Sequence, residues 1–229
     1  MRRVHDEYGC RVINISLADI KRPVGSKPSA WASALDTLAR ELDIVIIVSA
    51  GNASNSWLAS FGDSIVGRYP NFLFDESNRI LEPGSAVNVL TVGSIAHSNG
   101  LSTIDADNVG VRPIAQIQQP SPFTRIGPGA NKVLKPDLVD FGGTAVFDGP
   151  TQRLQSGSNR ANAGILSTHH QYLQQLFKFQ SGTSFAAPLV AHKAAMLFEN
   201  FPNASANLIR AFLALSGTSS TSTSFSERQ

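Results

Sequence analysis

The sequence predicts an α/β domain built on a mostly parallel β-sheet flanked by helices. Two β-branched, apolar runs of strand length, 11–17 and 44–49, lie on either side of a helical pattern. The second run is apolar without alternation, as expected for a strand that is covered on both faces. A third run of this kind, 88–94, supplies a further buried strand. Strand, helix and strand over this length form a βαβ unit, whose crossover is expected to be right-handed.

Three helices are expected. The first has Ser29 as a plausible N-cap, and an apolar stripe at helical spacing follows it: Trp31, Ala34, Leu35, Leu38 and Leu42. The second begins at about Ser184 and is apolar on nearly every side, so it is expected in the middle of the domain. The third is a short helix over 207–215.

Bulk properties exclude several classes of protein. The 229 residues are 42% hydrophobic, which is ample for one large core. A scattered net charge of +2 argues against nucleic acid or a membrane surface as partner. The single cysteine, Cys10, rules out an internal disulfide. There is no apolar run of transmembrane length and no signal-peptide h-region, so a cytoplasmic location is favoured.

No cofactor or metal is predicted. The sequence lacks the Gly-x-Gly-x-x-Gly pattern of dinucleotide-binding sheets and the Walker loop. Asp105, Asp107 and Asn108 hint at a calcium loop, but the EF-hand spacing and its final glutamate are missing. An Asx-rich turn is therefore the favoured interpretation of this cluster.

Ser184 is the candidate nucleophile. It lies at a tight turn into the apolar helix, where free backbone N–H groups favour nearby negative charge. Pro188 lacks an N–H and crowds the carbonyl four residues back, that of Ser184, which predicts distortion of the first turn. Taken alone, Gly-Thr-Ser before a helix would favour a simple N-cap.

The whole segment Gly182-Thr-Ser-Phe-Ala-Ala-Pro188 resembles the nucleophile signature of the subtilisin-like serine endopeptidases, the subtilases. Val48-Ser-Ala-Gly-Asn52 and Asn14-Ile-Ser-Leu17 are similar to two further subtilase segments in the same chain order. Segment 121–128 and the Lys-Pro-Asp stretch at 135–137 resemble scaffold segments of the family. The resemblance covers roughly residues 4–216.

The resemblance implies specific roles. The side chain of Asn52 donates a hydrogen bond to the oxyanion of the tetrahedral intermediate, together with the backbone N–H of Ser184. One loop offers backbone groups to an extended peptide, and a second lines the pocket for the side chain before the scissile bond. The implied substrate-binding residues are Ser16, Leu17 and Ala18 in the first loop, and Ser49, Ala50 and Gly51 in the second.

The family pattern is interrupted and modified in places. Ala18 and Asp19 stand where the family has glycines; Asp19 either narrows the cleft and favours basic side chains or is a solvated loop carboxylate. Residues 1–216 are expected to form a partial catalytic domain, with the N-terminal part of the domain missing and a flexible tail at 217–229. Three insertions are expected, at about 53–82, 99–119 and 143–180.

The catalytic His and Asp of the family precede the segment matched by 12–17 and are not found in this chain. The five histidines of the chain are His5, His97, His169, His170 and His192. His169 and His170 are nearest in sequence to Ser184; the family gives them no catalytic role, and replacement of the missing base by either is the less favoured alternative. The implied function is a serine endopeptidase acting on a peptide or protein, completed by the missing upstream part of its own domain. The alternative is a non-catalytic fragment or pseudoprotease that keeps the peptide-binding cleft.

Overall fold

A four-stranded parallel sheet forms the centre of the computed structural model, which describes residues 1–103, 105 and 110–217. Its strand order is β1-β3-β5-β7. The strands are β1 (Val12–Ile15), β3 (Val45–Ser49), β5 (Leu90–Ile95) and β7 (Leu138–Phe141). The predicted parallel α/β class is confirmed, and the three predicted strands lie within two residues of their expected bounds.

The described α-helices are α1 (Arg2–Tyr8), α2 (Ala30–Glu41), α3 (Asn55–Ala59), α4 (Ile65–Arg68), α5 (Thr183–Asn200) and α6 (Ala206–Ser216). The short 3₁₀ turns are η1 (Gly62–Ser64), η2 (Asn71–Phe74), η3 (Glu76–Asn78), η5 (Ala130–Lys132) and η6 (Ala161–Ala163). The remaining strands are β2 (Asp19–Pro23), β4 (Leu81–Glu82), β6 (Val111–Pro113), β8 (Ala145–Asp148), β9 (Arg153–Ser156), β10 (Ile165–Thr168) and β11 (Phe177–Gln180).

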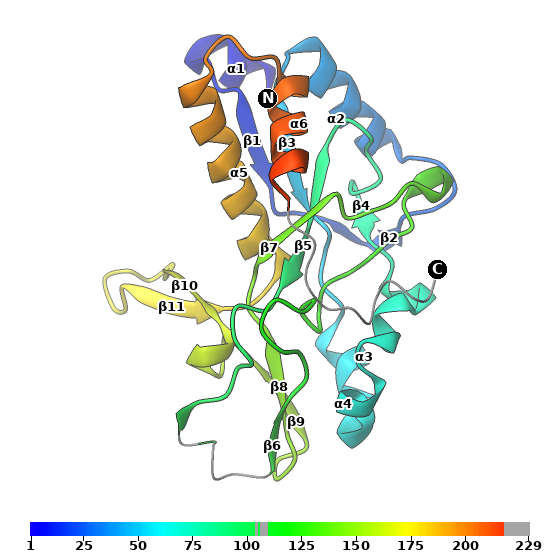
Figure 1. The fold of residues 1–229 in the computed structure, drawn as a ribbon, viewed down its shortest axis with the longest axis vertical. Coiled ribbons are helices and arrows are strands. Elements are labelled where there is room, and N and C mark those ends of the chain that lie inside the picture. Colours follow the sequence, from blue (N-terminus) through cyan, green and yellow to red (C-terminus); the bar gives the residue numbers. More distant parts are fainter. Residues whose placement is uncertain (104, 106–109, 218–229) are drawn as a thin grey trace.

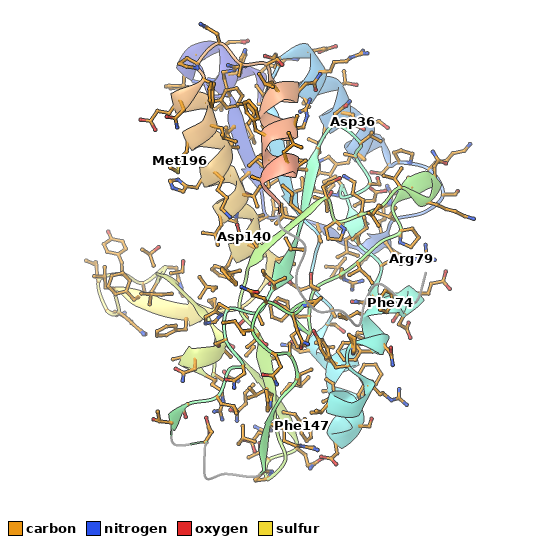
Figure 2. The ribbon with its side chains drawn as sticks, in the orientation of Figure 1. Asp36, Phe74, Arg79, Asp140, Phe147 and Met196 are labelled. Atoms are coloured by element: carbon orange, nitrogen blue, oxygen red, sulfur yellow. The ribbon has the colours of Figure 1, made fainter. Side chains whose placement is uncertain are left out.

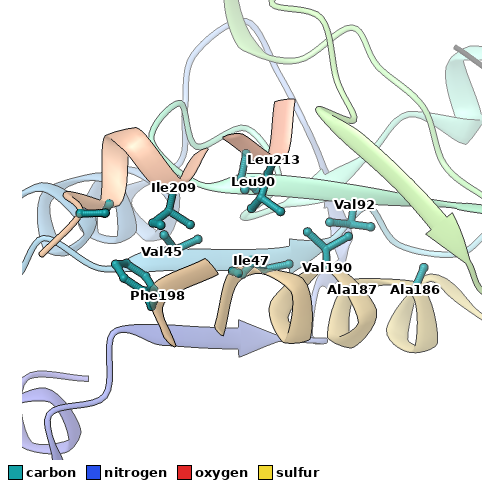
Figure 3. Packing of buried hydrophobic residues seen from close by; sticks show 13 residues of the cluster. Val45, Ile47, Leu90, Val92, Ala186, Ala187, Val190, Phe198, Ile209 and Leu213 are labelled. Atoms are coloured by element: carbon teal, nitrogen blue, oxygen red, sulfur yellow. The ribbon is translucent and has the colours of Figure 1, made fainter. Parts of the chain in front are cut away.

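The sheet is covered on both faces, as the side chains of strand β3 show. Its successive side chains point to opposite faces, and all five of its residues are buried. Val45 and Ile47 pack against α5 and α6, whereas Ile46 and Val48 pack on the side of α2. Figure 3 shows the first of these two cores. Ser29 caps α2 as predicted, since its hydroxyl accepts a hydrogen bond from the N–H of Ala32 at 3.1 Å.

Helix α5 differs from the prediction that it is buried on every side. One face packs across the sheet: Thr183, Ala186, Ala187, Val190, Ala194 and Phe198 are buried. The opposite face carries exposed polar residues such as His192 and Lys193, and Met196 is 48% exposed. Figure 2 shows Met196 on the outer side of the helix. The prediction was wrong because overall apolar composition does not fix how many neighbours a helix has.

The first insertion is more than a surface loop. It folds into α3, α4 and short 3₁₀ turns, and its apolar residues form a second core below the sheet with β8 (Figure 1). This core contains Leu58, Ile65, Phe72, Leu73, Phe123 and Phe147. The aromatic rings of Trp57, Phe61 and Phe72 contact one another at centroid distances of 5.0 to 5.9 Å.

The third insertion contributes β8 and β9 to a three-stranded antiparallel sheet, whose other strand, β6, comes from the second insertion. The third insertion ends in the hairpin β10–β11, which projects from the domain (Figure 1). This hairpin leads directly into α5, and its two strands pair antiparallel, with Ile165 opposite Gln180. In the second insertion, the carboxylate of Asp105 accepts hydrogen bonds from the N–H and hydroxyl of Ser102, which lower its pKa. Asp107, Asn108 and the predicted flexible tail beyond Gly217 lie outside the described residues.

None of the helices in the described ranges combines the length and apolar character that a membrane crossing requires.

The Lys-Pro-Asp stretch acts as scaffold, as predicted. The ammonium of Lys135, whose side chain is 1% exposed, donates to Asp137 Oδ2 at 2.6 Å and to the carbonyl of Val89 at 3.0 Å. The same Asp137 oxygen accepts from the N–H of Thr91 at 2.7 Å. Strand β5 is thereby tied to the start of β7.

We expect Asp137→Ala to lower the free energy of unfolding by about 3 kcal/mol, because it leaves a buried ammonium without its counter-charge. Urea denaturation measures this loss. The matched control is Asp63→Ala, which removes an exposed partner of Arg112 and should cost less than about 1 kcal/mol. Equal losses in the two variants would contradict a special role for the Lys135–Asp137 pair.

Candidate active site

The candidate site lies where the carboxyl ends of β1 and β3 meet the start of α5. Ligand sites of parallel sheets are found at this edge. Residues Ser16 to Ala18 follow β1, and Ala50 to Asn52 follow β3. Ser184 is the second residue of α5 and is half-buried. The fold thus gathers three segments that are far apart in the chain.

Asn52 contacts the start of α5 directly. Its Oδ1 accepts a hydrogen bond from the N–H of Thr183 at 2.9 Å and another from the Thr183 hydroxyl at 3.1 Å. Because Oδ1 is fixed by two donors, the other end of the amide, Nδ2, is left to donate. A Cβ placed on Gly182 would lie 3.2 Å from this Nδ2, so Nδ2 lies close to the turn into the helix.

The N–H of Ser184 is a second available donor. No hydrogen bond from it is found within the described residues, as expected for the first turn of a helix. The turn passes close to the sheet, since the N–H of Gly182 donates to the carbonyl of Gly142, the residue after β7, at 2.8 Å. The amide of Asn52 therefore contacts Thr183, the residue that directly precedes Ser184.

Pro188 changes the hydrogen bonding of the Ser184 carbonyl, because it has no N–H to donate to it. Helix α5 continues through Pro188 without a left-handed residue in its first turn, so the predicted distortion is not seen as a break. The carbonyl of Ser184, which lacks a donor from position 188, instead accepts a hydrogen bond from the hydroxyl of Ser16 at 3.2 Å. Ser16 thus connects the loop after β1 to the main chain of Ser184.

We expect Ser16→Ala to destabilise the protein by about 1 kcal/mol, since it leaves the carbonyl of Ser184 without its donor. In a Pro188→Ala background the restored N–H of residue 188 can bond this carbonyl, so the same substitution should cost less there. Thermal unfolding of the four proteins in this cycle checks the coupling. Additive effects would show that the two residues do not share the carbonyl.

The substrate-binding residues predicted from the sequence lie in two environments. Ser16 and Ala18 are half-buried, and Leu17 is 69% exposed beside the site. Ser49, Ala50 and Gly51 are buried. Ser49 pairs with Val92 of β5, whereas Leu81 of β4 lies beside Gly51 and donates its N–H to the carbonyl of Ala50 at 3.3 Å. Their roles in binding a peptide stay predictions. Asp19 begins β2, and its carboxylate accepts from the N–H of Lys21 at 3.0 Å.

Gly51 is needed for the turn that presents Asn52. Its φ is +94°, a conformation that residues with a Cβ rarely adopt. A Cβ there would also lie 3.1 Å from Leu81 and 3.2 Å from Arg125. The turn is therefore tightly packed against the side chains of Leu81 and Arg125. Arg125 was not among the site residues predicted from the sequence.

None of the five histidines, all in the described part of the chain, is hydrogen-bonded to Ser184. His169 and His170 stack on each other in the hairpin loop, and His192 is exposed on α5. Burial lowers the pKa of His97, whose Nδ1 is buried without a partner. Within the described ranges there is also no group of three or more potential metal ligands.

Two cavities, of about 550 and 630 Å³, are found away from this site. The first lies between β7, α5 and α6, and the second lies beside Val24 and Arg79. Neither is lined by Ser184 or Asn52.

The fold is a parallel α/β sheet, and Ser184 and the amide of Asn52 both lie near its carboxyl edge, where ligand sites of such sheets are found. The sequence model of the subtilase family of peptidases matches residues 1–229. The chain belongs to the subtilase family.

The chain is also similar to one curated protein and to several solved structures. The chain is 50% identical over 212 residues to the uncharacterized protein y4bN of Sinorhizobium fredii, a match that spans 92% of this chain and 49% of that protein. A protease from Pseudoalteromonas arctica PAMC 21717 has a similar fold, with a TM-score of 0.56 at 22% identity over 92% of this chain and 45% of that one.

Two further solved structures share the fold. The S41 psychrophilic protease gives a TM-score of 0.54 at 19% identity, over 93% of this chain and 50% of that one. The prenylagaramide maturation protease PagA gives a TM-score of 0.51 at 18% identity, over 92% of this chain and 53% of that one. The chain therefore spans about half the length of the relatives it matches.

Proposed function

We propose that this chain carries the nucleophile and the oxyanion site of a serine endopeptidase. The observation that carries the proposal is the contact between Asn52 and Thr183: two donors fix Oδ1 and leave Nδ2 to donate beside Ser184. An amide fixed in this way needs no reorganisation when negative charge develops on a substrate carbonyl. Membership of the subtilase family supports peptide-bond hydrolysis as the reaction.

In the proposed reaction, Ser184 Oγ attacks the carbonyl carbon of the scissile bond while a base takes its proton. The carbonyl oxygen becomes an oxyanion that accepts from Asn52 Nδ2 and the N–H of Ser184. Collapse of this intermediate breaks the C–N bond, and the base returns the proton to the leaving amine. Water then releases the acyl group from Ser184 by the same steps.

The general base and the acid that orients it are proposed to come from the upstream part of the same domain, outside this chain. Two observations support a partner at this place. No histidine of the described chain is bonded to Ser184. Strand β1 forms an edge of the sheet, and within the described ranges no strand pairs with its outer side. An added strand there would lie next to the loop that holds Ser16.

The substrate is proposed to be a peptide or protein bound in an extended conformation along Ser16, Leu17 and Ala18, with Ser49 to Gly51 forming the opposite wall. The exposure of Leu17 beside the site is consistent with contact to a substrate. Because Leu81 of β4 lies beside Gly51 in the second wall, the pocket that this wall lines would be shallow in this chain.

A second function is favoured by the same absence of a base: a non-catalytic module that binds peptides through the loop after β1. Oxyanion stabilisation and binding alone can leave about 10³–10⁴-fold catalysis over water, so weak turnover does not separate the two functions. A covalent probe does, because it requires an activated serine.

The test is labelling with a fluorophosphonate probe of this chain, of a longer polypeptide that restores the upstream part, and of Ser184→Ala in each. The proposal expects labelling of the longer form only, and none with Ser184→Ala. Labelling of this chain alone would place the base within it. No labelling of either wild-type form would reject the peptidase and favour the binding module.

A further inference from the structure

The turn that presents Asn52 is held by a neighbouring segment, residues 123–125. The N–H of Ala53 donates to the carbonyl of Phe123 at 2.7 Å, and the N–H of Arg125 donates to the carbonyl of Gly51 at 3.2 Å. These bonds place Asn52 opposite Thr124 in an antiparallel bridge. The main chain of Asn52 is therefore fixed by hydrogen bonds of its two neighbouring residues to segment 123–125.

The side chain of Arg125 also contacts the turn, through hydrogen bonds to main-chain carbonyls. Its Nε donates to the carbonyl of Asn52 itself at 2.9 Å. Its Nη1 donates to the carbonyls of Ser77 at 3.0 Å and Arg79 at 2.9 Å. One guanidinium thus joins the turn of Asn52 to the segment leading into β4, whose Leu81 also lies beside Gly51.

The contact of Arg125 with three carbonyls depends on the planar guanidinium group, which holds its N–H donors in a fixed arrangement. Within the described ranges no carboxylate pairs with Arg125, so backbone carbonyl dipoles stabilise its charge. Arginine presents several N–H donors in a fixed plane and stays charged even where burial lowers its pKa. A lysine ammonium on a flexible stem cannot reach three carbonyls with the same fixed geometry.

We propose that Arg125 is a positioning residue of the oxyanion site, which orients the amide of Asn52 by holding its main chain. This inference rests on the proposed function. Asn52 is held at two points, its carbonyl by Arg125 and its Oδ1 by Thr183, and Nδ2 is aimed by the combination of the two. An oxyanion donor displaced by about 1 Å loses on the order of 10² in rate.

The test measures the orientation of Asn52 without relying on catalysis. Asn52 Oδ1 is the acceptor for the N–H of Thr183, so hydrogen exchange of that amide, followed by NMR in this chain, reports on the contact. We expect exchange to be about 10- to 100-fold faster in Arg125→Ala, the range that loss of charge-assisted hydrogen bonds implies. Arg125→Lys should restore little of the protection.

Two controls make the result specific. Arg79→Ala removes a neighbouring arginine whose side chain pairs with Glu76 at 3.7 Å, and it should leave Thr183 exchange unchanged. The amide of Ile209 in α6, which donates to the carbonyl of the N-cap residue Ser205, should exchange at its wild-type rate in every variant. In an Asn52→Ala background, which removes the acceptor, adding Arg125→Ala should have no further effect on Thr183.

In the longer polypeptide, Arg125→Ala should lower kcat about 10- to 100-fold with KM nearly unchanged. Unchanged exchange at Thr183, or equal acceleration at Thr183 and Ile209, would overturn the positioning role. These exchange rates are decisive even if no form reacts with the fluorophosphonate probe. Rejection of the peptidase and rejection of the Arg125 contact are therefore separate outcomes.

Discussion

Replacing Ser184 by alanine in the longer polypeptide is expected to lower kcat for peptide hydrolysis by about 10⁶, a magnitude carried over from subtilisin itself. The loss is this large because the hydroxyl forms the covalent bond to the substrate, and the remaining groups only bind and stabilise charge. Steady-state kinetics with a chromogenic peptide, together with active-site titration, provide the measurement.

The matched control is Ser33→Ala, an exposed serine on α2 that is remote from the site. It should leave kcat and KM unchanged. Circular dichroism and unfolding curves should be the same for Ser184→Ala and the wild type, since the Ser184 hydroxyl makes no hydrogen bond within the described residues. A Ser184→Ala protein that keeps wild-type turnover would reject Ser184 as the nucleophile.

Replacing Asn52 by alanine is expected to lower kcat by about 10²–10³ with little change in KM. This is about 2.7–4 kcal/mol of transition-state stabilisation, also a value measured on subtilisin. The amide interacts with charge that exists only in the transition state, so its loss leaves ground-state binding nearly intact. The kcat and KM of the longer form provide the measurement.

Asn55→Ala is the matched control for Asn52, because it removes an exposed asparagine three residues further along the chain. Its kcat should equal that of the wild type. A loss in Asn52→Ala that falls on KM alone would mean that the amide binds the substrate's ground state. An unchanged kcat would show that another group stabilises the oxyanion.

Much of the fold could be predicted from local patterns. The continuous apolar run at 44–49 indicated a strand covered on both faces, and Val45 and Ile46 do pack on opposite cores. The cap at Ser29 also follows from residues close in sequence. By contrast, the number of neighbours around α5 and the second core of the first insertion depend on contacts between distant segments, for which local periodicity carries no signal.

The sequence alone determined the family and the two residues on which the proposed chemistry depends, because the segments around Asn52 and Ser184 are short and specific in residue type. Only the tertiary structure decided how they meet. The hydrogen bond from Thr183 to Asn52 joins residues that are 131 positions apart in the sequence. The contact of Arg125 with the carbonyl of Asn52 joins residues that are 73 positions apart. Such contacts arise when parallel strands bring their carboxyl ends to one edge, so the orientation of a side-chain amide is fixed by packing across the whole domain.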